Sequence, residues 1–177
     1  VHDRNEVSLI DLNETSERSG WPAFALKRSD GLAFGQPAED QCMATPRQVC
    51  STFLEELSHG SSHLGGNRNA PAYPELPYYF LRDVLDRVRE RVGQIDRVLL
   101  TVPQAYLEEE YGRSEKIGLL LGMIKDIGVP LVGIAGIAVA SLYRSLNPLP
   151  PPGVPFLHIE LFLHSIQISV CIREAEI

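Results

Sequence analysis

One segment, residues 97–102, limits the fold of this 177-residue chain more than any other. From Val98 to Val102 it is an almost continuous apolar run, which Pro103 ends. A run of this kind predicts a strand of a parallel sheet that is buried on both faces. Parallel strands need a crossover connection, usually a helix. Because amphipathic helical patterns lie on both sides, at 78–92 and 108–127, we expect an α/β domain.

The other predicted elements place antiparallel strands before this parallel part. Alternating residues predict strands at 7–12, 23–27 and 32–35, and the turn Arg28-Ser29-Asp30-Gly31 joins the last two into a hairpin. A helix is expected at 45–58, since Pro46 suits a first helical position and apolar residues recur at helical spacing. Three elements are expected in the second half: a strand at 131–134, a helix at 135–146 and an apolar hairpin at 156–172. Together they describe a mixed sheet with flanking helices.

Composition narrows the class of protein. With 44% hydrophobic and 22% charged residues, the chain resembles an average soluble domain, and its net charge of -7 argues against nucleic acid or an anionic membrane as a partner. Three cysteines, an odd number, suit a reducing compartment, so we expect a cytoplasmic protein. The most apolar stretch, 117–142, is interrupted by Lys125, Asp126 and Pro130, which argues against a membrane span. Because the chain begins with Val1, we expect a piece of a longer protein.

Three parts are expected along the chain. Residues 1–147 form the main lobe, the proline-rich residues 148–155 act as a stiff spacer, and residues 156–177 form the apolar hairpin. The hairpin has few polar positions, so both of its faces are expected to need burial. Either it docks on its own sheet or, as an exposed edge, it pairs with another chain. We therefore expect a homodimer through residues 156–172.

Two histidines in the polar loop 59–77 raise an alternative. His59 and His63 could bind a metal, or serve Ser61 or Ser62 as a base in a small hydrolase. A zinc site needs three or four ligands, and no nearby residues complete one. A nucleophile also needs an orienting acid, which the loop does not offer. The loop is better interpreted as polar and flexible.

Four short motifs follow one another along the chain: Ile10-Asp11-Leu12 with Thr15, Phe34-Gly35-Gln36-Pro37-Ala38 with Thr45-Pro46, Val102-Pro103 before a helix, and Ala138-Val139-Ala140-Ser141-Leu142-Tyr143. Their order resembles the first lobe of the 70-kDa heat-shock chaperones, in the superfamily of actin, these chaperones and the sugar kinases. The resemblance covers nearly the whole chain. It implies a ribonuclease H-like mixed sheet with flanking helices, one lobe of an actin-like ATPase fold.

In that family two turns, a lysine and a glutamate act on ATP and its magnesium. Carried over, the resemblance implies four nucleotide-binding positions in the two turns: Asp11, Asn13, Thr15 and Glu160. Only Asp11 and Thr15 match the family. Asn13 replaces a glycine and Glu160 an aspartate, and other substitutions are Glu14 for a threonine, Leu54 for the lysine, Ala135 for the glutamate, and Phe162, Leu163 and His164 for three glycines.

These substitutions remove the charges that phosphoryl transfer requires. We interpret the chain as a non-catalytic, chaperone-like lobe, without a cofactor or metal, that acts as a scaffold or protein-interaction module. Its expected partner is another protein or the missing second lobe. The alternative is a divergent ATPase of the heat-shock chaperone type, which would bind ATP with magnesium.

Overall fold

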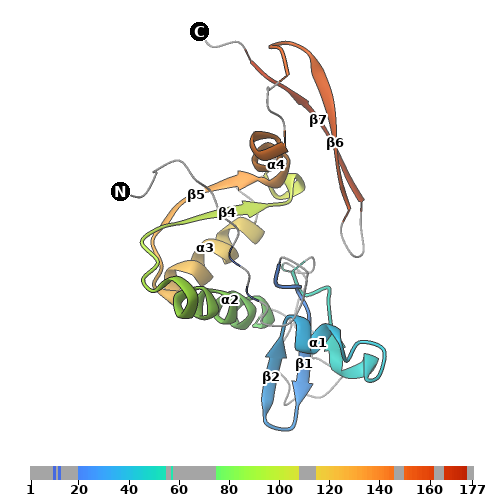
Figure 1. Ribbon diagram of the computed structural model, residues 1–177, viewed down its shortest axis with the longest axis vertical. Coiled ribbons are helices and arrows are strands. Elements are labelled where there is room, and N and C mark those ends of the chain that lie inside the picture. Colours follow the sequence, from blue (N-terminus) through green and yellow to red (C-terminus); the bar gives the residue numbers. More distant parts are fainter. Residues whose placement is uncertain are drawn as a thin grey trace. The chain divides into compact units, whose positions relative to one another are not determined.

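The computed structural model describes residues 10, 12, 20–54, 57, 75–107, 115–145, 150–161 and 166–174, with only the backbone for 142–145. The chain divides into two compact units, Val1–Ile95 and Asp96–Ile177. Figure 1 shows their helices and strands. Helices occur together with antiparallel and parallel strand pairs, so the α/β class is confirmed. The described strands form three separate sheets, and not the one mixed sheet that was predicted. The predicted strand 7–12 lies outside the described residues except Ile10 and Leu12, which have no regular secondary structure.

The first unit contains a three-stranded antiparallel sheet. Its strands are β1 (Ala25–Arg28), β2 (Gly31–Phe34) and β3 (Val49–Cys50), in the order β2-β1-β3. The predicted hairpin is confirmed, since Arg28 pairs with Gly31 across a two-residue turn. Gly31 has a φ of 142°, a conformation that favours glycine. A short helix, α1 (Gln36–Glu39), follows β2 directly.

The predicted helix at 45–58 is wrong in its described part. Pro46–Gln48 form a single 3₁₀ turn, and the chain then extends as β3. Val49 and Cys50 pair there with Leu26 and Ala25 of β1. Pairing with β1 buries Cys50 and provides hydrogen-bond partners for the backbone around Val49, a β-branched residue that favours strands. These tertiary contacts override the helical spacing of the apolar residues. Residues 55, 56 and 58 lie outside the described part.

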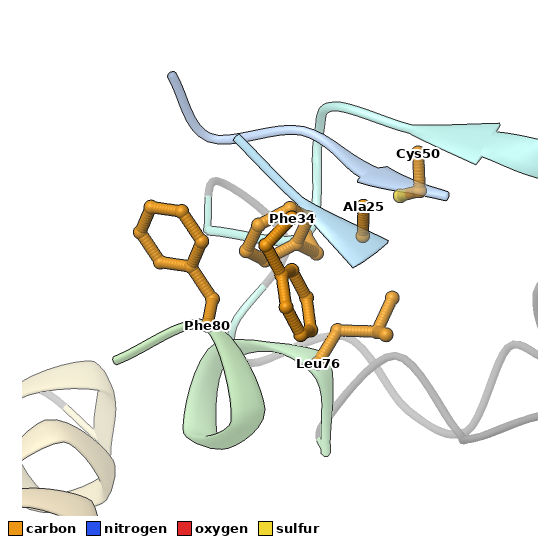
Figure 2. Packing of buried hydrophobic residues seen from close by; sticks show 6 residues of the cluster. Ala25, Phe34, Cys50, Leu76 and Phe80 are labelled. Carbon is orange, nitrogen blue, oxygen red and sulfur yellow. The ribbon is translucent and has the colours of Figure 1, made fainter. Parts of the chain in front are cut away.

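Helix α2 (Leu76–Val92) supplies one side of the core of this unit. The sequence predicts this helix from residue 78, and the helix begins two residues earlier, with a proline in its first turn. Figure 2 shows Leu76 and Phe80 of α2 beside Phe34 of β2. The ring of Phe80 meets Phe34 at 6.0 Å and Phe53 at 5.5 Å between centroids, both edge to face. This geometry is favoured for aromatic pairs.

The second unit begins with the parallel pair β4 (Val98–Val102) and β5 (Leu131–Gly136). The parallel crossover predicted from residues 97–102 is confirmed, and it contains α3 (Glu115–Ile127). The predicted burial of both sheet faces is not confirmed, because Leu99 of β4 and Val132 of β5 are 59% and 60% exposed. The next helix, α4 (Ile137–Ser145), starts two residues later than predicted because Ala135 and Gly136 still belong to β5. None of the described helices combines the length and apolarity that crossing a bilayer requires.

The predicted apolar hairpin is confirmed as β6 (Pro155–Leu161) and β7 (Ile166–Ile172). The strands pair in antiparallel register from Pro155↔Ile172 to Leu161↔Ile166. Within the same unit, β7 contacts α4. The end of the predicted spacer is fixed to the hairpin, since the N–H of Gly153 donates to the carbonyl of Arg173 at 2.9 Å.

Candidate functional site

Of the four residues predicted to bind nucleotide, the structure describes only Glu160. Asp11, Asn13 and Thr15 lie outside the described residues, as do His59 and His63 of the polar loop. Glu160 lies near the end of β6, opposite Gln167 of β7. The described part of the chain therefore contributes a single carboxylate to the predicted nucleotide site.

Glu160 is a buried carboxylate. Its side chain is only 8% exposed, and within the described part of the structure neither carboxylate oxygen has a hydrogen-bond partner. His158 lies two residues earlier on the same face of β6, and its Nδ1 is also buried and unpaired there. Removing such groups from water without new hydrogen bonds is costly. This inner face of the hairpin is therefore polar, although it is turned away from solvent.

Gln167 holds the inner face to the end of β4. When its amide is oriented with the oxygen toward that segment, it accepts hydrogen bonds from the N–H groups of Gln104 and Ala105, both at 3.1 Å. These two residues begin the 3₁₀ turn Gln104–Tyr106 that follows β4. Packing at the end of the neighbouring strand is also close, because a Cβ added to Gly136 would overlap the side-chain oxygen of Gln104.

The inner face carries hydrogen-bonding groups of Glu160 and His158 that have no partner among the described residues. The carboxyl ends of parallel strands are where open α/β sheets bind their ligands, and Glu160 could provide one oxygen to a cation or a ligand N–H. Throughout the described residues, however, no group of three or more His, Cys, Asp or Glu is arranged to hold a metal ion. The inner face offers one buried carboxylate and not a complete site.

The outer face of the hairpin has the opposite character. We define it as the outward residues of four cross-strand pairs: Pro155↔Ile172, Leu157↔Val170, Ile159↔Ile168 and Leu161↔Ile166. Its seven branched aliphatic side chains are 54% to 77% exposed. They offer on the order of 700 Å² of contiguous apolar surface, more than the few hundred Å² that a soluble monomer typically exposes in one patch.

The prediction that both hairpin faces need burial agrees with the structure on one face only, because the inner face is buried or half-buried and the outer face is exposed. The inner face is also more polar than predicted, since His158, Glu160, Gln167 and Ser169 lie there beside Phe156 and Cys171. Apolar and polar residues alternate from Leu157 to Leu161 in β6 and from Ile166 to Val170 in β7. Alternation with period two is the signal of a strand with unlike faces. The outer face could therefore have been found from the sequence by separating odd from even positions in β6 and doing the same in β7. What the sequence does not reveal is which face turns toward the rest of the unit.

Two further clusters lie in the first unit. The arginines of α2 form ion pairs within the helix, between Arg82 and Asp86 at 3.7 Å, Arg87 and Asp83 at 2.9 Å, and Arg89 and Asp86 at 2.8 Å. Pairs at this spacing stabilise the exposed side of a helix. An open pocket of about 310 Å³ at the β1–β2 turn is lined by Lys27, Arg28 and Asp30 among others. Its charges are of both signs and define no ligand class.

No protein-family model matches the chain, and no curated protein matches it.

Proposed function

We propose that this chain is a non-catalytic, actin-like lobe with a ribonuclease H-like sheet, and that it acts as a protein-interaction module. The observation that carries the proposal is the outer face of β6 and β7, an apolar surface more than half exposed. The order of elements supports the fold, since an antiparallel hairpin precedes helices that alternate with parallel strands. The substituted phosphate turns support the absence of catalysis.

The anchoring of the hairpin supports a role in binding. Gln167 and the contact with α4 hold the inner face to its own unit. The aliphatic side chains of the outer face are thereby presented on a fixed strand pair, so a partner would pay little entropy for ordering them. At about 25 cal/mol per Å², covering such a surface yields on the order of 10 kcal/mol or more before the costs of association.

A site-specific cross-linking experiment tests this proposal. A photo-reactive amino acid is placed at position 168 on the outer face, and in a control at position 132, where the native valine is 60% exposed and the native Ile168 is 63% exposed. Irradiation in a cell extract is expected to join position 168 to a defined protein, either another molecule or a second copy, while position 132 gives none. Equal labelling at both positions, or none at either, would refute an interaction surface on the hairpin.

Glu160 favours a second candidate, a divergent nucleotide-binding ATPase. A buried carboxylate whose two oxygens have no partner in the described part of the chain would accept a magnesium ion or a water that the ion holds. Calorimetric titration with magnesium-ATP and magnesium-ADP decides between the candidates. Micromolar binding that is lost in Glu160→Gln would support the ATPase, and absence of heat in both proteins would support the non-catalytic lobe.

A further inference from the structure

We propose that the partner of the outer face is a second copy of this chain, so that two hairpins pack face to face in a two-fold symmetric homodimer. This inference rests on the proposed function, since it names the occupant of the same surface. A two-fold interface places one surface patch against itself and requires the patch to be self-complementary. The outer face meets this requirement in charge and in shape, and its area is large enough for a stable interface.

Charge is the first argument. Every side chain of the outer face is apolar, whereas the chain as a whole carries a net charge of -7. A net charge of this size makes two copies of the chain repel each other on average. The outer face is uncharged and can meet its own copy without this repulsion.

Shape is the second argument. The branched aliphatic residues occupy both strands, in pairs such as Leu157↔Val170 and Ile159↔Ile168. A two-fold axis in the plane between two such faces therefore sets aliphatic side chains of one copy against aliphatic side chains of the other. Two sheet faces covered in this way interdigitate at a separation of about 10 Å.

Area is the third argument. The surface of on the order of 700 Å² that each copy offers is close to the about 800 Å² that each partner buries in a stable interface of standard size. Pairing through the open edges of β6 or β7 would bury less of it, because edge pairing joins backbones and leaves the outer face in water. The face-to-face arrangement is the one that covers the apolar side chains.

The first test is the mass of the intact chain by sedimentation over a range of concentrations. The native chain is expected to be a dimer, and the double variant Ile159→Ser/Ile168→Ser is expected to dissociate at least about 100-fold more readily, because the dimer loses four buried aliphatic side chains. Val132→Ser is the matched control, since it removes a similarly exposed valine from another strand, and it should remain a dimer. Far-ultraviolet circular dichroism checks that each variant is folded.

The second test separates the two faces by disulfide formation. Ile168→Cys lies on the outer face and should join two copies under mild oxidation. Ser169→Cys lies on the inner face and should join no more copies than the native chain, whose Cys42, Cys50 and Cys171 are free thiols. A dimer that survives the double serine variant, or that cross-links equally at 169, would overturn the arrangement.

The outcomes also distinguish this inference from the proposed function. A native chain that is monomeric at all concentrations, but whose position 168 still cross-links another protein, would refute the second copy and retain the interaction module. A monomer that cross-links nothing at 168 would refute both.

Discussion

The indole nitrogen of Trp21 donates a hydrogen bond to Oδ2 of Asp83, 3.1 Å away and 62 positions later in the chain. The Nε of Arg87 donates to the same oxygen at 2.9 Å, and its guanidinium lies 4.1 Å above the centre of the Trp21 ring. One carboxylate therefore joins the segment before β1 to helix α2. Because the three groups pair with one another, they stabilise the first unit and leave no obvious position for a ligand.

We expect Asp83→Ala to lower the free energy of unfolding by about 1–3 kcal/mol, since it leaves the indole N–H and the guanidinium without their acceptor. Asp86→Ala is the matched control in the same helix. Its ion pairs are exposed at the surface, so its loss should be under about 1 kcal/mol. Urea unfolding followed by Trp21 fluorescence measures both, and equal losses would show that the contact with Trp21 adds nothing.

Gly35→Ala should be among the most damaging substitutions in the first unit. Gly35 has a φ of 72°, and a Cβ built on it would overlap the indole ring of Trp21. Backbone strain and the displacement of Trp21 together are expected to cost about 2–4 kcal/mol. Gly31→Ala provides the comparison, because Gly31 also has a positive φ but no heavy atom within 4 Å of the added Cβ. Its cost should be about 1 kcal/mol, and thermal unfolding of the two variants should differ accordingly.

Glu160→Gln is expected to stabilise the protein by about 1–2 kcal/mol at neutral pH, because it replaces a buried carboxylate, unpaired among the described residues, by an uncharged amide of similar shape. Glu174→Gln, at an exposed position after β7, should change the stability by less than about 0.5 kcal/mol. Chemical denaturation is the measurement. If Glu160→Gln proved destabilising, the carboxylate would have to be engaged in a favourable interaction in solution.

Gln167→Ala should loosen the hairpin without unfolding the rest of the second unit. The substitution removes the acceptor for two backbone N–H groups, with an expected cost of about 1–3 kcal/mol. Hydrogen exchange should become faster at the amides of Gln104 and Ala105 and along β7, while β4 and β5 keep their protection. Ser169→Ala, on the same face of the same strand, should leave these rates nearly unchanged. Uniformly faster exchange in both variants would argue against a specific contact of Gln167 with Gln104 and Ala105.

The sequence predicts most of the elements because their signals are local. The turn at 28–31 has a glycine where φ must be positive, and α2 has a long amphipathic period that only a helix satisfies. The helix predicted at 45–58 fails for the opposite reason. Its apolar spacing suits a helix, but Val49 and Cys50 gain more by pairing with β1, which lies more than 20 positions earlier. Such non-local competition has no local signature.

The candidate sites also divide into features with a local sequence signal and features that depend on distant contacts. The hairpin and its apolar character follow from the alternation in residues 155–172. The position of Glu160 was predicted only through a resemblance, and its burial depends on what packs against the inner face. The bonds from Gln104 and Ala105 to Gln167 join residues more than 60 positions apart, so they could not be read from spacing.

The connection lengths of the strand pairs have a consequence for the route by which the chain folds. β6 and β7 are joined by only residues 162–165, whereas β4 and β5 meet across residues 103–130. A local hairpin forms in about 1–10 μs, and a parallel pair with a long crossover forms more slowly. We therefore expect the outer face of β6 and β7 to assemble before the unit that anchors its inner face. Concentrated refolding mixtures should then lose more protein to aggregates than dilute ones.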